Sequence, residues 1–144
     1  MTATNTFTGP TTRSVAEPAS ASKPVWRTGV VAGLTASAAT AGTAAVARAL
    51  DVSLEVGGKA IPVIGFAQLT FVFSIVGTIL AVVLSRRATR PQHTFLTSTI
   101  ALTVLSIVPD ALADAQTSTR FTLALTHVVA AAIVIPALAS RLSR

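Results

Sequence analysis

Four apolar runs constrain this chain more than any other feature. They cover residues 28–47, 61–84, 94–113 and 121–140 and hold almost no charged side chain. Each is about twenty residues long or longer, enough for a helix to cross roughly 30 Å of hydrocarbon. Charged residues make up only 11% of the chain, and the mean hydropathy is +0.71. The runs predict an all-α membrane protein with four transmembrane helices in an antiparallel bundle.

The residues before the first run differ sharply from the rest. Residues 1–22 are rich in Thr, Ser, Ala and Pro and show no apolar period, so they cannot bury enough surface to become ordered. We expect a disordered tail at 1–22 and a transmembrane domain at 23–144. An alternative makes the first run a signal peptide cleaved after Ala47-Arg48-Ala49. Its basic region would start late, and the run exceeds the usual length of roughly 7–15 residues.

The basic residues predict the orientation. They flank the runs in three clusters, namely Lys23 with Arg27, Arg86 and Arg87 with Arg90, and Arg141 with Arg144. With four spans all three clusters lie on one side, and the positive-inside rule makes that side cytoplasmic. We therefore expect a multi-pass protein of the plasma membrane whose N- and C-termini are both cytoplasmic.

Small residues recur at every fourth position of the first run, at Gly29, Gly33, Ser37, Ala41 and Ala45. Such a column lets another helix approach closely, although an Ala-rich run can also produce it by chance. We interpret Gly29, Gly33, Ser37 and Ala41 as a helix-packing face. In the connection that follows, apolar and polar residues alternate before Gly57-Gly58, which predicts a short extended excursion with a glycine turn.

His127 is the ionisable side chain that lies well inside a predicted span. An ionisable group in the bilayer is costly to keep, so it is a candidate for binding a proton, a ligand or a cofactor. The structural alternative is a neutral imidazole that forms a hydrogen bond with a Ser or Thr of another helix.

A second set of candidates lies towards the outer side. Its four carboxylates are Asp51, Glu55, Asp110 and Asp114. Oxygen-rich clusters suit Ca²⁺, Mg²⁺ or a pore mouth, but no loop has the spacing of a metal site. We interpret the set as solvated loop charge, partly paired with Arg48, Lys59 and Arg120, and keep Asp110, Asp114 and Arg120 as candidate functional residues beside His127.

Several chemistries have no residues to support them. The chain has no cysteine, and it contains no phosphate-binding Gly-rich loop, nucleophile elbow, HExxH or CxxC motif. His93 and His127 lie too far apart along the membrane normal to ligate one haem. The net charge of +6 comes from cations at the ends of spans, so nucleic acid is not an expected partner. We expect no enzyme activity, no cofactor and no metal.

Three stretches resemble a known family. They are "IPVIGFAQLT" at 61–70, "RRATRPQHTF" at 86–95 and "LTVLSIVPDALADAQTSTRFTLALTHVVAAAIVIPALASRL" at 102–142. They are similar to small four-span membrane proteins of high-GC Gram-positive bacteria, classed as a domain of unknown function. The resemblance covers the chain from about Trp26 onwards. It implies four spans and an intact first helix, and it transfers no catalytic residue.

Two functions follow from these observations. The first is a non-enzymatic packing or accessory component of a membrane assembly, either a homo-oligomer or a larger complex in the lipid bilayer, joined through the small-residue column. The alternative is a small transporter or proton-coupled carrier that uses His127. Four-span multidrug exporters resemble the chain in outline, but they depend on a carboxylate in the first span, where this chain has only Thr and Ser.

Overall fold

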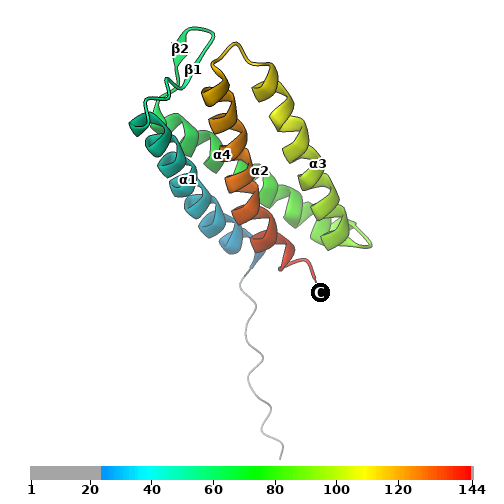
Figure 1. The fold of residues 1–144 in the computed structure, drawn as a ribbon. Helices are drawn as coiled ribbons and strands as arrows, with labels where there is room; N and C mark the ends of the chain where they lie inside the picture. Colours follow the sequence, from blue (N-terminus) through cyan, green and yellow to red (C-terminus); the bar gives the residue numbers. More distant parts are fainter. Residues whose placement is uncertain (1–23, 144) are drawn as a thin grey trace, which may run out of the picture.

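The computed structural model describes residues 24–143, which form four long helices. They are α1 (Val25–Ala49), α2 (Val63–Arg87), α3 (Pro91–Leu112) and α4 (Thr117–Ala139) (Figure 1). All four are long and apolar enough to cross a membrane. The predicted all-α, four-helix membrane protein is confirmed. The predicted tail at 1–22 lies outside the described residues, as do Lys23 and Arg144.

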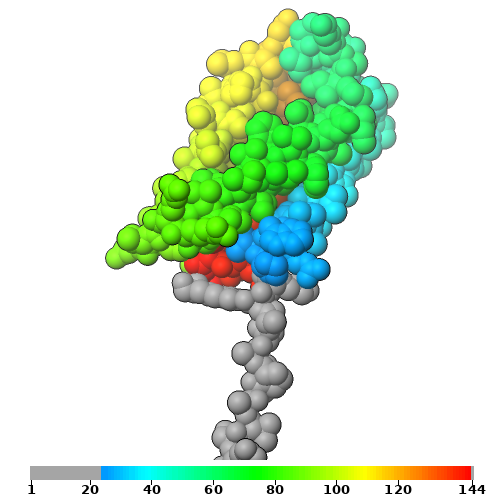
Figure 2. All heavy atoms as spheres, turned by 180° about the vertical axis from the view of Figure 1, so that it is seen from behind, coloured from blue at the N-terminus to red at the C-terminus, as the bar shows by residue number. Residues whose placement is uncertain are grey.

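The helices form two layers. In Figure 1, α4 stands between α1 and α3, and α2 crosses behind them at an angle. The view from behind shows α2 running diagonally across that face (Figure 2). Because of this crossing, α2 contacts all three other helices, while α4 also packs against α1 and α3.

The helices differ slightly in length from the predicted runs. α1, α3 and α4 begin earlier than predicted, and α2 ends later, because helical hydrogen bonding continues into polar residues at the membrane surface. Pro91 both separates α2 from α3 and occupies the first turn of α3, where its fixed φ suits a helix and its missing N–H costs nothing.

Small and hydroxyl-bearing side chains make up much of the interior, beside a few large ones such as Phe66, Phe95 and Leu138, and large apolar side chains cover the outside. The buried polar residues are Ser37, Thr40, Ser74, Thr78, Thr119, Thr122 and Thr126. The exposed apolar residues include Leu34, Leu69, Phe73, Ile79, Ile100 and Leu105. In water so large an apolar surface would drive association. In lipid it is favourable, and small interior residues let the helix backbones approach closely.

α1 packs closely against α2 at its glycines. A Cβ atom added to Gly29 would overlap the hydroxyl and methyl groups of Thr78, and one added to Gly33 would lie 2.9 Å from the Cβ of Ser74. The predicted column therefore faces α2 of the same chain at its first positions. Ala41 is only half-buried, because 3.6 residues per turn rotate a strict four-residue column off the contact.

The connection between α1 and α2 folds over one end of the bundle. Strands β1 (Glu55–Val56) and β2 (Lys59–Ala60) pair antiparallel around Gly57-Gly58, both of which have positive φ. The side chain of Leu54 is fully buried and packs with Ala44, Ala47 and Phe66. The extended excursion with a glycine turn is confirmed, and Leu54 anchors it to the helices.

Candidate functional site

The polar residues of α3 lie on one side of the helix. They are Thr99, Thr103, Ser106 and Asp110, whose spacing of three or four residues places them on one face, and all are at least partly buried. The three hydroxyls donate to carbonyl oxygens one turn earlier in the same helix, as Ser and Thr commonly do in membrane helices. The row ends at Asp110, the carboxylate of this face.

Asp110 meets His127 of α4. The Oδ2 atom of Asp110 lies 2.9 Å from the Nδ1 atom of His127, and the two side chains are 14% and 37% exposed, respectively. Side chains lean towards the N-terminus of their own helix. Because α3 and α4 are antiparallel, Asp110 leans back into the bundle and His127 leans towards the end of the bundle that carries the β1–β2 hairpin. The backbone positions of the two residues lie at different depths in the bundle, but their side chains come into contact.

The hydrogen bonds of the pair are compatible with one added proton. The Nδ1 atom also lies 3.1 Å from the carbonyl oxygen of Leu123. A ring nitrogen carries at most one hydrogen, so it donates to one of these acceptors at a time. The hydrogen bond found for Nδ1 is the one to this carbonyl, and the buried Oδ2 has no hydrogen-bond partner among the described residues. A proton on Asp110 could instead be donated to Nδ1 of the neutral ring.

The charge of the pair depends on that proton. With Asp110 ionised and His127 neutral, the pair has a charge of −1 beside hydrocarbon. One added proton brings its net charge to zero, whichever of the two groups holds it. An uncompensated charge in an apolar environment is costly. The chain can therefore exist in two states, one with the negatively charged pair and one in which an added proton makes the pair neutral.

The sequence interpretation of Asp110 needs a correction. Asp110 lies within α3 and is mostly buried, so it is not a solvated loop charge, and the partner of His127 is this carboxylate and not a Ser or Thr. One signal could have indicated this: the spacing from Ser106 to Asp110 continues the polar face of α3. The partner on α4 was not visible in the sequence, because it depends on how the two helices are staggered.

The other carboxylates of the outer set do not join the pair. Asp114 and Glu55 line a shallow cleft of about 330 Å³ beside the hairpin, together with Ser53, Gly58, Ala115 and Gln116. The carbonyl oxygen of Asp114 accepts a hydrogen bond from the backbone N–H of Gly57 at 2.8 Å. Asp51 lies in the turn after α1, with φ at 60°. The predicted set of four is therefore divided between different places.

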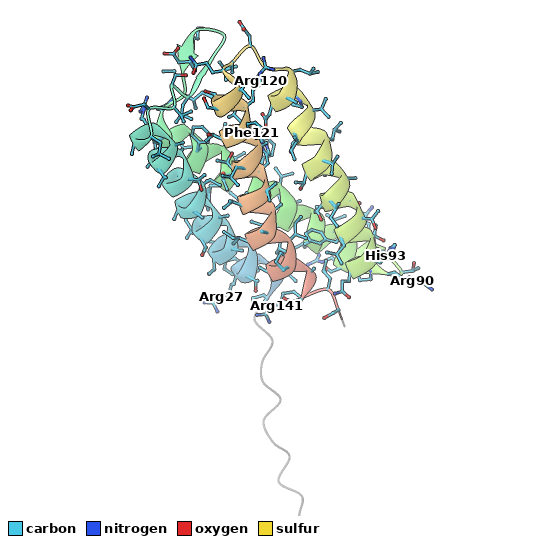
Figure 3. The ribbon with its side chains drawn as sticks, in the orientation of Figure 1. Arg27, Arg90, His93, Arg120, Phe121 and Arg141 are labelled. Atoms are coloured by element: carbon cyan, nitrogen blue, oxygen red, sulfur yellow. The ribbon has the colours of Figure 1, made fainter. Side chains whose placement is uncertain are left out.

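Metal and haem sites can be considered from the same geometry. Across residues 24–143, no three His, Cys, Asp or Glu residues come together as metal ligands. His93 occupies the first turn of α3 at the opposite end from the hairpin (Figure 3). Asp110, the neighbour of His127, is roughly 25 Å further along α3 by helical rise. The two histidines therefore cannot bind one haem within a single chain.

Arg120 holds the turn between α3 and α4. Its Nε atom donates to the carbonyl oxygen of Ala115 at 3.0 Å, and an Nη atom donates to that of Ala111 at 3.2 Å. The last carbonyls of a helix have no partner within the helix, so Arg120 of α4 satisfies one at the end of α3. Both hydrogen bonds hold this turn, and neither joins Arg120 to Asp110 or His127.

Replacing Arg120 with Gln is expected to loosen this turn. The substitution removes two hydrogen bonds from a charged donor, worth about 1.5–3 kcal/mol each when buried and less at this partly exposed position. Amide hydrogen exchange should become faster at residues 111–116 in the variant. Lys59→Gln, a charge loss in the exposed strand β2, is the control and should leave exchange at this turn unchanged.

A comparison with known proteins identifies the family of the chain. A family model described as a family of unknown function, DUF6069, matches residues 20–144. This confirms the resemblance to a domain of unknown function. No curated protein matches the chain, and no solved structure does.

Proposed function

This chain belongs to the family of unknown function DUF6069, which brings no activity with it, and from its site we propose a small proton-coupled membrane carrier. In this proposal Asp110 and His127 together bind and release the proton. The observation that carries it is the contact of 2.9 Å between Oδ2 and Nδ1, inside a helix pair long and apolar enough to span a membrane. The proposed carrier is not an enzyme.

The charge of the pair supplies the coupling. A pair that holds the proton is neutral and can stay beside hydrocarbon. When the proton leaves, the remaining negative charge favours either contact with water or a cation at the same place. Loss of the proton is therefore linked to a second event, a movement of the helices or the entry of a cation. The hydroxyls of Thr99, Thr103 and Ser106 extend the polar face roughly 17 Å from Asp110 along α3.

The position of the carboxylate bears on the choice between the two functions. The absence of an acid from the first span counted against a carrier. Asp110 supplies a mostly buried carboxylate on α3, which supports a carrier built around a different helix. The assembly function depended on the small-residue column, whose Gly29 and Gly33 lie against α2 of the same chain. Both observations favour the carrier.

The proton-binding role can be tested by nuclear magnetic resonance on histidine nitrogens. The chain contains two histidines, so a His93→Gln variant assigns both signals. We expect the nitrogen signals of His127 to change in Asp110→Asn, because the substitution removes the carboxylate beside its Nδ1 atom. The His93 signal should be the same with either residue at position 110. A His127 signal that is unaffected by Asp110→Asn would contradict the proposed pair.

The transport role needs a cellular assay. A deletion strain complemented with each variant is scored for growth under pH or drug stress, beside the protein level. His127→Gln and Asp110→Asn should each abolish complementation while the protein remains present, since neither amide titrates near neutral pH. Asp114→Asn is the matched control and should complement fully. Complementation by the His127→Gln variant would remove the carrier from consideration.

The proposed orientation places both termini in the cytoplasm. It is supported by the arginines, which flank α1, α2 and α4 at one end of the bundle (Figure 3). Reporter fusions after Thr89 and after Arg144 should read cytoplasmic, whereas reporters inserted at Gly58 and at Gln116 should read external. An external C-terminus would contradict the scheme.

A subunit of a larger membrane assembly is the second candidate, and the exposure of α3 favours it. Phe95 is the buried residue of α3, and large apolar side chains such as Leu102 and Leu105 point outward. Native mass spectrometry from lipid nanodiscs would show an oligomer or a co-purifying protein if this function holds. Detection of a single chain with no bound partner would favour the carrier instead.

A further inference from the structure

Arginines are concentrated at one end of the bundle, and the carboxylates of the described residues lie elsewhere. Arg27 lies in the first turn of α1, Arg86 and Arg87 end α2, and Figure 3 places Arg27, Arg90 and Arg141 at the same end of the bundle. The carboxylates within residues 24–143 are Asp51, Glu55, Asp110 and Asp114, which belong to the hairpin half of the bundle. The side-chain ion pair found among these residues is Asp110 with His127. The positive charge at the arginine end is therefore uncompensated by the described part of the protein.

Arg141 is the most constrained of these side chains. Its Nε atom is buried and has no hydrogen-bond acceptor within residues 24–143. Arg120, at the other end, shows the contrast, since its guanidinium donates to two carbonyl oxygens. A buried charged donor without an acceptor is costly. Arg141 therefore carries a positive charge that no carboxylate among residues 24–143 neutralises.

The residues on either side of Arg141 are packed into the bundle. Leu138, Ala139 and Leu142, on either side of it in the sequence, belong to an apolar cluster against which Val25 of α1 also packs. Figure 2 shows the start of α1 lying against the C-terminal end of the described chain. This packing brings the first turn of α1, with Arg27, next to the segment that carries Arg141.

The first turn of α1 itself favours an anion. Its first N–H groups form the positive end of the helix dipole. This turn contains no acidic residue, and Pro24 provides no side-chain cap. Arg27 adds a further positive charge there. An anion placed at this turn would be attracted by the dipole and by the guanidinium together.

The flanking residues identify the source of the anion. Trp26 is exposed beside Arg27, whose guanidinium lies 5.8 Å from the ring centroid, and Trp is typical of the headgroup level of a bilayer. Val30, Val31 and Leu34 follow Arg27 at helical spacing and are exposed. If a lipid phosphate lies at Arg27, the acyl chains of that lipid would thus follow an apolar track along α1. Such a track suits acyl chains and offers nothing to free phosphate.

We propose that Arg141 and Arg27 bind the phosphate of an anionic phospholipid, whose acyl chains lie along Val30, Val31 and Leu34 of α1. The guanidinium of Arg141 supplies charge-assisted hydrogen bonds of the kind that phosphate oxygens accept. Arg27 and the dipole of α1 complete the anion site, and Trp26 packs at the level of the lipid glycerol. This site is independent of the Asp110–His127 pair.

The single tryptophan makes the site directly measurable. The chain contains one Trp, and it is Trp26, so its fluorescence reports on lipids at this site. Full-length protein is reconstituted in phosphatidylcholine vesicles that contain a small fraction of lipid with brominated acyl chains, which quench tryptophan. Brominated phosphatidylglycerol should quench Trp26 more than brominated phosphatidylcholine at the same mole fraction. The ratio of the two gives the preference for the anionic lipid.

Matched variants locate the preference. Arg141→Gln should lower it about fivefold, the factor that corresponds to about 1 kcal/mol for one arginine near a membrane surface. Arg27→Gln/Arg141→Gln should remove it. Arg48→Gln removes an exposed arginine from the other end of the same helix and should leave the preference unchanged.

Three results would overturn the proposal. The first is equal quenching by the two brominated lipids in the native protein. The second is a loss in Arg48→Gln as large as that in Arg141→Gln, which would indicate net charge alone. The third is full reversal of quenching by millimolar inorganic phosphate, which would indicate a site for soluble phosphate. A thermal unfolding profile in detergent, compared with that of the native protein, establishes that each variant is folded.

Discussion

The Gly29→Ala variant should unfold at a markedly lower denaturant level than the native protein. The added Cβ would overlap the hydroxyl and methyl groups of Thr78 and lie 2.8 Å from its Cβ. α1 and α2 would have to separate, and overpacking of this kind costs about 1–3 kcal/mol. Titration of the detergent-solubilised protein with sodium dodecyl sulfate, followed by circular dichroism, measures the loss. Gly33→Leu should lower stability and abundance for the same reason.

Gly42 provides the control within the same helix. A Cβ at Gly42 meets no atom within 4 Å, so Gly42→Ala should be neutral or should stabilise by up to about 1 kcal/mol through helix propensity. Removing the Thr78 side chain beyond Cβ, in Gly29→Ala/Thr78→Ala, should restore part of the lost stability. A Gly29→Ala protein as stable as Gly42→Ala would contradict the close α1–α2 contact.

Replacing His127 with Leu should destabilise the protein more than replacing both members of the pair. The single change leaves the mostly buried Asp110 without its partner, and a charged side chain at membrane depth costs about 2.5–3.5 kcal/mol on the insertion scale. Asp110→Leu/His127→Leu removes the stranded carboxylate and should recover most of that loss. Burying apolar groups of similar size in place of an ion pair is often neutral or stabilising.

A double-mutant cycle measures this coupling. The four proteins are the native chain, Asp110→Leu, His127→Leu and the double variant, compared in the same denaturant titration. The losses from the single variants should not add, because the double variant lacks the unpaired group that harms one of them. Asp114→Leu combined with His127→Leu is the control and should be additive, since Asp114 lines the cleft beside the hairpin. Additivity at Asp110 as well would show that the pair does not interact.

The two members of the candidate pair differ in how visible they are in the sequence. His127 stands out because a titratable side chain within an apolar run is costly and rare. Asp110 lies near the end of its run, where a carboxylate is also typical of a solvated loop. Its burial follows from the face that α3 turns towards α4. The opposite holds for Arg120, which is conspicuous in the sequence and proves to hold a turn.

The amino-acid sequence alone determines the four helices and their membrane character. Lipid offers no hydrogen-bond partner, so each apolar run must satisfy its backbone groups internally and form a helix. Length and hydropathy along the chain are sufficient for this inference, because the interaction is local. The glycine turn between β1 and β2 could be predicted because it too depends only on residues that are neighbours in the chain.

Only the tertiary structure decides which surfaces meet. The column at Gly29 and Gly33 was visible as a packing face, but the choice of α2 as its partner depends on the angle at which α2 crosses the bundle. The contact of Asp110 with His127 and the position of Arg141 beside α1 depend in the same way on the stagger of neighbouring helices. That stagger is set by many small side-chain contacts between residues distant in the chain, and no single run of residues encodes it.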